Sequence, residues 1–326
     1  MIYSRFLSNR PDISLRISLT DRCQLRCFYC MPSEGIAKIK HEQILTFEEI
    51  IRFLKMAMTA FEIRKIHLTG GEPLVRTGVV NLVENISSLG IADVAMTTNG
   101  QYLAELAPQL RRAGLTRVNI SCDSLNERTF RDITRSGRLS DTLDGIKAAC
   151  RWFKSVKLNT VVLKGLNDGE VVDISSYGME RGCEVRFIEL MPIHCARLFF
   201  DKMFVPASET YARLAERFTL EPLPYQPGES SRKFAAVDGR GQSGVIGFIC
   251  SLSKPFCGDC RRIRLTSDGR LISCLARGHG IQIRKYLQHA SDQSTMKLNE
   301  IIQNELINKR VRESYETVEP MTVVGG

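Results

Sequence analysis

Apolar and polar positions follow two different patterns between residues 14 and 190, one typical of strands and one typical of helices. Six short apolar runs have the length and composition of buried strands, and each is followed by a segment with helical spacing of its apolar residues. The first such segment, residues 46–61, opens with a capping box in which Thr46 caps the helix and Glu49 reciprocates. The expected strands are residues 15–19, 65–69, 94–98, 117–122, 156–163 and 185–190.

This pattern predicts an α/β fold. Because βα crossovers are right-handed, six consecutive units form a parallel sheet with helices outside, either open or rolled into a barrel. Active sites of barrels lie at the carboxyl ends of the strands. Six units fall short of eight, so we expect an incomplete, TIM-like (βα)6 barrel. Polar and functional residues follow the expected strands at that end: Asp21, Glu72, Asn99, Asp123, Lys164, and Met191 with His194.

The alternation of expected strands and helices changes after about residue 195. A helix is expected over residues 206–218, followed by a loop rich in Pro, Gly and Ser over residues 222–231. Two short strands, residues 262–266 and 270–274, are joined by Ser267-Asp268-Gly269, which is typical of a hairpin turn. We therefore divide the chain into a partial barrel over residues 1–195 and an α+β extension over residues 196–326.

Composition narrows the class of protein. The 326 residues are 43% apolar and 25% charged, as in ordinary globular proteins, and no apolar run approaches the roughly 18 residues of a membrane helix. No signal peptide pattern is visible, so we expect a cytoplasmic protein. Eleven cysteines are many for that compartment, and their odd number favours metal or redox chemistry over disulfides. The net charge of +9 suits an anionic partner, either a nucleotide or a nucleic acid.

The first cysteine motif is Cys23-x3-Cys27-x2-Cys30, in the loop after the first expected strand. Three thiolates on one short loop can each bind one iron of a [4Fe-4S] cluster, which leaves the fourth iron open to a small molecule. The alternative is a structural zinc site. Zinc usually takes four Cys or His ligands, and only His41 is near enough in sequence to be the fourth.

The second motif is Cys257-x2-Cys260-x13-Cys274. The expected hairpin returns Cys274 towards the first two cysteines, so a common metal site, again with three thiols, is reasonable. Arg262 and Arg264 alternate on one strand and therefore share a face. Paired guanidinium groups beside an open cluster suit a ligand that carries phosphate, although a solvated basic strand is the alternative.

The motifs resemble the radical S-adenosylmethionine superfamily. Its signature is Cys-x3-Cys-x-aromatic-Cys, with Tyr29 as the aromatic residue, and Thr69-Gly70-Gly71-Glu72-Pro73 is similar to its GGEP element. The resemblance implies that the open iron binds S-adenosylmethionine and that reductive cleavage yields a 5′-deoxyadenosyl radical. The cofactor contacts implied by the same match are Tyr29, Gly71, Ser121 and Met191.

Two cysteine motifs, with further motifs in order between them, resemble more narrowly the MoaA-type GTP 3′,8-cyclases of molybdenum cofactor biosynthesis. The resemblance implies that the radical removes hydrogen from C3′ of GTP, and that a second [4Fe-4S] cluster holds the guanine so that C8 can be attacked. It also implies an electron donor, a homodimer, a downstream cyclic pyranopterin monophosphate synthase, no membrane or nucleic-acid partner, and a Gly325-Gly326 tail that reaches the active site. The implied GTP contacts are Arg16, Thr97, Lys164, Arg262, Ile263 and Arg264.

One position departs from that family, which usually has arginine where this chain has His67. A neutral histidine cannot bind phosphate in the bidentate manner of arginine, so we assign it no GTP role. Two alternatives stay open: a radical enzyme acting on RNA or a peptide, and a non-enzymatic zinc protein that uses Cys27-x2-Cys30 together with Cys257-x2-Cys260. The remaining cysteines are interpreted as buried or incidental thiols: Cys122, Cys150, Cys183, Cys195 and Cys250.

Overall fold

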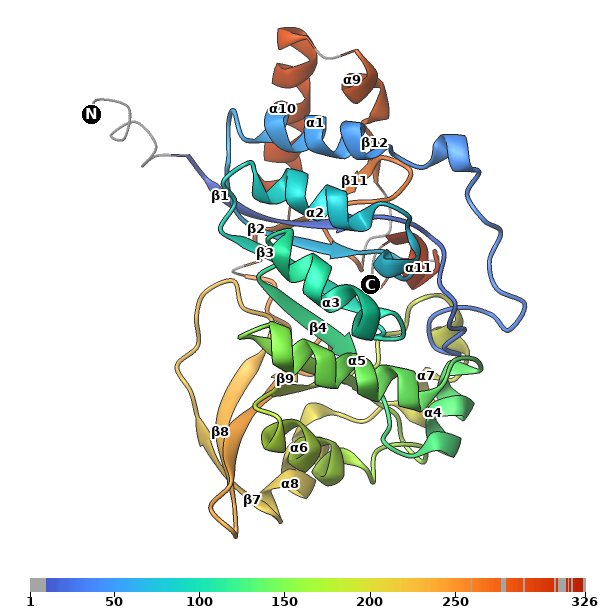
Figure 1. Ribbon diagram of the computed structural model, residues 1–326, viewed down its shortest axis with the longest axis vertical. Coiled ribbons are helices and arrows are strands. Elements are labelled where there is room, and N and C mark those ends of the chain that lie inside the picture. Colours follow the sequence, from blue (N-terminus) through green and yellow to red (C-terminus); the bar gives the residue numbers. More distant parts are fainter. Residues whose placement is uncertain are drawn as a thin grey trace.

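A single twelve-stranded mixed sheet organises the protein, in the order β12-β11-β10-β1-β2-β3-β4-β5-β6-β9-β8-β7 (Figure 1). The computed structural model describes residues 10–258, 260–276, 280–289, 291–307, 309, 315, 317 and 319–324, so the Gly325-Gly326 tail lies outside the described residues. The strands are β1 (Asp12–Ser18), β2 (Glu62–Thr69), β3 (Asp93–Thr98), β4 (Arg117–Ser121), β5 (Val156–Val162), β6 (Glu184–Glu189), β7 (Phe218–Pro222), β8 (Arg232–Asp238), β9 (Ser243–Ile249), β10 (Arg262–Leu265), β11 (Arg270–Ile272) and β12 (Ile281–Gln282).

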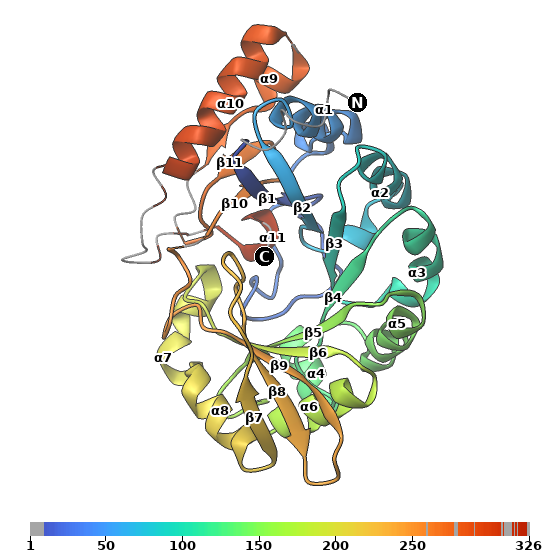
Figure 2. The same cartoon turned by 90° about the vertical axis from the view of Figure 1, so that its left-hand side faces the viewer.

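The six strands expected in the first 190 residues are confirmed as β1 to β6, and all of them pair in parallel. Figure 2 shows them as an open arc with α1, α2, α3, α5 and α6 on its convex side, which is an incomplete barrel. The helices are α1 (Phe47–Ala57), α2 (Val79–Ser87), α3 (Leu103–Arg112), α4 (Glu127–Thr134), α5 (Leu139–Trp152), α6 (Val171–Glu180), α7 (Phe200–Met203), α8 (Ala207–Ala215), α9 (Arg284–Gln288), α10 (Asp292–Ile307) and α11 (Met321–Val324); the 3-10 helices are η1 (His41–Gln43), η2 (Pro73–Val75) and η3 (His194–Leu198).

Alternation along each strand separates a helix-facing core from a polar interior. In β1, Leu15 and Ile17 are fully buried in the core that also includes Phe53 of α1. Their neighbours Ser14 and Arg16 face the opposite side, because successive side chains in a strand point to opposite faces. The concave side of the sheet is therefore the place for a polar ligand.

The expected capping box of α1 is confirmed. The Thr46 hydroxyl accepts a hydrogen bond from the Glu49 amide, and the Glu49 carboxylate accepts one from the Thr46 amide at 2.8 Å. The helix ends at Ala57, four residues before the predicted end at position 61. The chain tightens there into i to i−3 hydrogen bonds, from the Thr59 amide to Met56 and from the Ala60 amide to Ala57.

The C-terminal extension does not form a separate sheet. β10 pairs in parallel with β1, and β9 pairs in parallel with β6, so both flanks of the barrel are completed by strands from beyond residue 195. The expected hairpin is confirmed by the antiparallel pairing of β10 with β11. The division at residue 195 stays a prediction, and the two predicted parts share one sheet.

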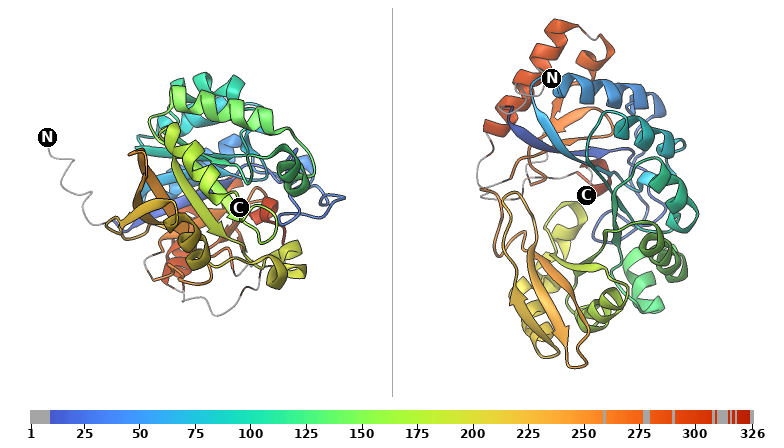
Figure 3. Two further views of the ribbon diagram at one scale, coloured as in Figure 1. Left: turned by 90° about the horizontal axis from the view of Figure 1, so that it is seen from below. Right: turned by 60° about the vertical axis from the view of Figure 1, so that its left-hand side comes forward.

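The C-terminal helix α11 lies inside the arc of strands, as Figure 2 and the right-hand view of Figure 3 both show. A backbone hydrogen bond from Thr322 of this helix reaches the Cys30 thiol. The end of the described chain thus meets the first cysteine loop. Across the described ranges, every helix is too short or too polar to cross a bilayer.

Candidate active site

The first cysteine motif forms a tight loop after β1. The Cys30 amide donates to the Cys27 carbonyl at 2.9 Å, which turns the chain back so that the thiols are close enough to interact. Burial and, to a lesser extent, the neighbouring Glu72 carboxylate raise the pKa of Cys23 to about 11. Burial also raises the pKa of Cys27, as do Asp123 and the other two thiols. Thiols in such surroundings ionise when a metal binds them.

Donors are directed at these sulfur atoms. The Asn99 side-chain amide lies 3.7 Å from the Cys23 sulfur, and the backbone of Thr322 donates to Cys30. Within the part of the chain that the structure describes, no three His, Cys, Asp or Glu side chains converge on a single ion. Thiolates that bind different irons of a cluster need not converge in that way, so the three cysteines fit a [4Fe-4S] cluster.

The Thr-Gly-Gly-Glu-Pro element holds the cysteine loop in place. A Cβ atom at Gly70 would lie 2.5 Å from the Thr20 carbonyl oxygen, and one at Gly71 would lie 2.3 Å from that of Arg22. The two glycines therefore allow their own backbone to pack closely against the chain that enters the cysteine loop. The buried Glu72 carboxylate accepts hydrogen bonds from the Thr98 hydroxyl at 2.8 Å and the Asn99 amide at 2.7 Å, which ties the loop to the end of β3.

The other predicted cofactor residues surround this same end of the barrel. The Tyr29 hydroxyl donates to Asp123 at 2.6 Å, and burial raises the pKa of that carboxyl group to about 6. Ser121 is the last residue of β4, and Met191 follows β6 by two residues. A pocket of about 70 Å³ opens beside Cys23. Because these strands are parallel, their carboxyl ends bring all four predicted contacts, including Gly71, to one rim.

The second cysteine motif lies at the opposite end of the barrel. Cys257 and Cys260 precede β10, whose first residue pairs with Ser14 of β1. The antiparallel register of Arg264 with Ile272 places Cys274 beside the start of β10 as well. The charge of Lys309 lowers the pKa of the Cys260 thiol against the opposing effect of burial, and the same ammonium interacts with Cys274. The expectation that the hairpin gathers these thiols fits this register.

The distance between the two motifs excludes one zinc site shared by them. The first loop follows Ser18 and the second precedes the partner of Ser14, so at least four strand residues, about 13 Å, separate them. Zinc binds sulfur at about 2.3 Å. The proposed ligand pairs Cys27-x2-Cys30 and Cys257-x2-Cys260 therefore cannot hold one ion together, and this alternative is wrong.

Between the two ends, the barrel interior is strongly cationic. In the register of the sheet, Arg16 of β1 lies opposite Arg264 of β10 and His67 of β2. Burial lowers the pKa of Arg16 well below its usual range, and the charges of Arg264 and Arg262 lower it further. Burial lowers the pKa of Arg264 to about 10 and that of Lys65 to about 8, with neighbouring cations adding to both shifts. The interior cations, called the basic interior below, are Arg16, Lys65, Arg117, Lys157, Arg186, Arg262 and Arg264.

Acidic residues balance only part of this charge. Asp93 binds Arg117 at 2.7 Å, and Glu184 contacts Lys157 and Arg186. Several buried polar atoms of the described interior residues also have no hydrogen-bond partner in the protein. These atoms are Arg16 Nε, Ser18 Oγ, Asn119 Oδ1 and Asn159 Oδ1. Since buried polar groups are normally paired, both observations indicate a polyanionic, polar ligand.

The predicted GTP residues do not all lie in this interior. Thr97 does, and its hydroxyl is 2.6 Å from His67 Nε2. Burial and nearby Arg16 lower the pKa of His67, so it is neutral there. Ile263 is fully buried on the helix-facing side, with only its backbone near the interior. Lys164 is exposed beyond the carboxyl end of β5, so the structure does not bring it to the basic interior.

The motif comparison missed several interior residues that alternation along the strands could have found. Lys65 with His67, Lys157 with Asn159, and Glu184 with Arg186 are polar pairs spaced two apart within the strands. Such spacing places both members on one face, and in a barrel that face is the interior. Arg117 follows the same rule with Asn119. Lys309 carries no such signal, because it lies in a C-terminal segment outside any strand.

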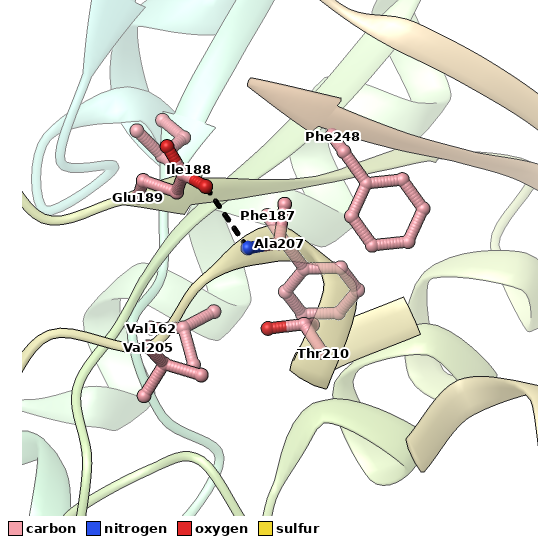
Figure 4. Close-up of a pocket in the computed structure, with 8 residues that line it drawn as sticks. All are labelled: Val162, Phe187, Ile188, Glu189, Val205, Ala207, Thr210 and Phe248. Carbon is pink, nitrogen blue, oxygen red and sulfur yellow. Dashed lines mark hydrogen bonds between the residues drawn. The ribbon is translucent and has the colours of Figure 1, made fainter. Parts of the chain in front are cut away.

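Glu189, at the end of β6, connects the barrel to the second cysteine segment. Its buried carboxylate accepts hydrogen bonds from the Ala207 amide at 2.9 Å, the Leu252 amide at 2.7 Å and the Ser253 amide at 3.0 Å. The Ser253 hydroxyl donates to it too. Figure 4 shows the carboxylate directed at Ala207, the first residue of α8. This one side chain therefore fixes the irregular segment that leads from β9 towards Cys257.

We expect Glu189→Gln to lower the free energy of unfolding by about 3 kcal/mol, because an amide NH2 would face backbone donors and leave some of them unpaired. Chemical denaturation would measure this. Glu209→Gln is the matched control, since Glu209 is a partly exposed partner of Arg213 and its loss should cost less than about 0.5 kcal/mol. Equal stability of the two variants would contradict the role assigned to Glu189.

Comparison with known proteins agrees with this geometry. Residues 17–177 match the radical SAM superfamily, and residues 183–315 match the Molybdenum Cofactor Synthesis C family. A GTP 3′,8-cyclase of Geobacter sulfurreducens is 44% identical over 276 residues, which are 84% of this chain and 83% of that protein. A GTP 3′,8-cyclase of Desulforamulus reducens is 40% identical over 323 residues, 98% of each chain. The crystal structure of Streptococcus suis SuiB bound to S-adenosylmethionine has a TM-score of 0.60 and 14% identity, covering 93% of this chain and 69% of that one, which supports the fold alone.

The partial barrel and its first cysteine loop define a radical S-adenosylmethionine enzyme, a class that uses S-adenosylmethionine and a [4Fe-4S] cluster. Within that class, the match to the C-terminal family and the identity to the curated relatives are decisive. The chain belongs to the GTP 3′,8-cyclase family.

Proposed function

We propose that this chain converts GTP to 3′,8-cyclo-7,8-dihydroguanosine 5′-triphosphate, the first step of molybdenum cofactor biosynthesis. The observation that supports it best is the basic interior, with its unpaired polar atoms, lying between two three-cysteine sites on one barrel. A triphosphate would supply negative charge to balance the excess positive charge of the basic interior. A reaction that joins a ribose carbon to a base carbon needs one rigid cavity that holds both parts of the same nucleotide.

At the carboxyl ends of the strands, Cys23, Cys27 and Cys30 would hold the [4Fe-4S] cluster. When bound there, the cluster and S-adenosylmethionine supply the 5′-deoxyadenosyl radical that removes hydrogen from C3′. Tyr29, fixed by its hydrogen bond to Asp123, presents an aromatic ring beside the cysteine loop. The other proposed contacts with S-adenosylmethionine are Gly71, Ser121 and Met191.

In the interior, we assign the triphosphate to the cations that the sheet brings together. Arg16 and Arg264 are paired across β1 and β10, and both can bind phosphate oxygens in a bidentate manner. Lys157 lies on the interior face of β5, so we give it the role expected for Lys164. The Thr97 hydroxyl is a further polar contact, with Ile263 contributing only backbone groups.

At the opposite end of the barrel, Cys257, Cys260 and Cys274 would hold a second [4Fe-4S] cluster, and the guanine base would lie beside it. Arg262 connects the two regions, because it shares the strand face of Arg264 and lies next to Cys274 in register. Lys309 Nζ donates to the Arg262 carbonyl at 2.5 Å and so positions the start of β10. Its positive charge also lowers the pKa of the Cys260 thiol and so favours the thiolate there.

The remaining partners are proposals that rest on the family resemblance. They are an electron donor for the first cluster, a cyclic pyranopterin monophosphate synthase that takes the product, a homodimeric assembly and a cytoplasmic location. We propose no role for nucleic acid, because the cationic residues named above face the barrel interior rather than an exposed surface.

The test is anaerobic incubation of the reconstituted enzyme with S-adenosylmethionine, dithionite and GTP deuterated at C3′. We expect deuterium in 5′-deoxyadenosine, one cyclised nucleotide per cleavage, and about eight irons per chain. Unlabelled 5′-deoxyadenosine formed without consumption of GTP would refute the substrate. About four irons per chain would refute the second cluster, and faster turnover with RNA or a peptide would favour that alternative.

Binding of GTP to the same holoenzyme should depend on pH through Lys65. The pKa of Lys65 is lowered to about 8 without an anion nearby, and bound phosphate raises it. Affinity is therefore full below pH 8 and falls as pH rises, by up to about tenfold per pH unit. Titration calorimetry between pH 7 and 9 would measure this. Lys65→Arg should lose most of the decline, whereas Lys55→Arg, at an exposed position on α1, should keep it. A flat profile in the wild type would contradict the assignment.

A further inference from the structure

Two cysteines outside both cluster sites lie in contact on the helix-facing side of the barrel. The sulfur atoms of Cys150 and Cys183 are 3.4 Å apart, although the residues are 33 positions apart in sequence. Cys150 belongs to the last turn of α5, and Cys183 immediately precedes β6. Cys183 packs in the hydrophobic core, and the next residue, Glu184, faces the basic interior, so the sheet separates the two thiols from the substrate region.

The local backbone holds Cys183 in this position. The Cys183 amide donates to the Gly178 carbonyl at 2.9 Å, and the Gly182 amide donates to Met179 at 3.0 Å. Gly182 has a φ of 67°, a left-handed conformation that ends α6 and turns the chain into β6. The Cys183 side chain is therefore fixed by a helix-ending turn, and it faces the end of α5.

The two thiols differ in exposure and in electrostatic surroundings. Cys150 is partly exposed, whereas Cys183 is only 2% exposed. The hydrogen bond from Cys183, together with the charge of Arg181, lowers the pKa of Cys150 to about 7, while the same hydrogen bond raises that of Cys183. Arg181 is held in place by its stacking on the Tyr177 ring, 3.7 Å from the ring centre. An accessible thiol beside a cation, next to a buried thiol, is the arrangement of an attacking and a resolving cysteine.

We propose that Cys150 and Cys183 are a redox-active pair that forms a reversible disulfide, with a low-molecular-weight disulfide as the oxidant. The Cys150 thiolate attacks one sulfur of that disulfide and releases one thiol. Cys183 then gives up its proton and attacks the Cys150 sulfur of the mixed disulfide, releasing the second thiol. Two protein thiols are oxidised, and one external disulfide is reduced to two thiols.

The bond would connect the end of α5 to the start of β6. β6 carries Glu184 and Arg186 into the basic interior, so the disulfide would fix the strand on which those two residues lie. Cys122 does not share this arrangement, since its sulfur contacts the Ser124 carbonyl rather than another sulfur. Cys122 is also buried nearby, and it is the matched control.

The test uses the holoenzyme under anaerobic conditions, incubated with glutathione disulfide, alkylated and digested with trypsin without reduction. Cys150 is the only cysteine of the tryptic peptide 148–151, and Cys183 is the only cysteine of peptide 182–186. We expect the two peptides joined and two hydrogens lighter in the wild type and in Cys122→Ala, separated again by dithiothreitol, and never joined in Cys150→Ala. The joined form should also raise the melting temperature, because the link constrains the unfolded chain.

Either of two results would overturn the proposal. One is recovery of both peptides as separate alkylated or glutathionylated species in the wild type after equilibration. The other is a joined peptide with no rise in melting temperature, which would mean that the bond does not fit the native fold.

Discussion

Cys274→Ala is expected to cleave S-adenosylmethionine to 5′-deoxyadenosine while forming the cyclised nucleotide at least about 100-fold more slowly. The reason is the separation of the two cysteine motifs along β1 and β10, which leaves the first site about 13 Å or more from the altered residue. On the proposed function, loss of one of three ligands at the second site would free the guanine from a fixed position. Paired assays for 5′-deoxyadenosine and for the cyclised product would measure both activities.

The matched control is Cys250→Ala. Cys250 is a buried cysteine just after β9 that belongs to neither motif, and its replacement should leave both products within about twofold of the wild type if stability is retained. Loss of both activities in Cys274→Ala, with the first cluster still present by its absorbance, would show that the two sites do not have separate roles.

Local features of the fold could be predicted because their physical causes are local. The first strand, expected at residues 15–19, and the Thr46 capping box depend on neighbouring residues, and both are confirmed. The hairpin at Ser267 to Gly269 is confirmed for the same reason. The insertion of β10 beside β1 could not be predicted, because pairing between residues about 250 positions apart leaves no trace in periodicity.

The candidate site shows the same limit. Motifs predicted the cysteines, the alternating Arg262 and Arg264, and Lys164, which is exposed just beyond the end of β5, but they did not indicate Lys157 on its interior face. Lys157 could have been found from its two-residue spacing to Asn159 once the strand was predicted. The contact of Cys150 with Cys183 depends on how α5 packs against the start of β6, so the sequence left both among the incidental thiols.

Arg16→Met should have opposite effects on the free protein and on GTP binding. Without a ligand, Arg16 is a buried cation beside Arg262 and Arg264, and its Nε has no partner within the protein. Replacing it with an apolar side chain of similar length removes that repulsion, so the free energy of unfolding of the ligand-free protein should rise. With GTP, the same change leaves phosphate oxygens unpaired and should cost about 2 kcal/mol or more, roughly a 30-fold increase in Kd.

The opposite signs distinguish a cation kept for binding from one kept for structure. Loss of a structural arginine would lower stability, and loss of an arginine with neither role would change neither the free energy of unfolding nor Kd. Arg112→Met is the matched control, since Arg112 is exposed on α3 and its replacement should leave Kd unchanged and alter stability by less than about 0.5 kcal/mol. Thermal melts of the ligand-free variants and calorimetric titration with GTP would measure both effects. A destabilised Arg16→Met with unchanged Kd would show that the basic interior does not hold the triphosphate through Arg16.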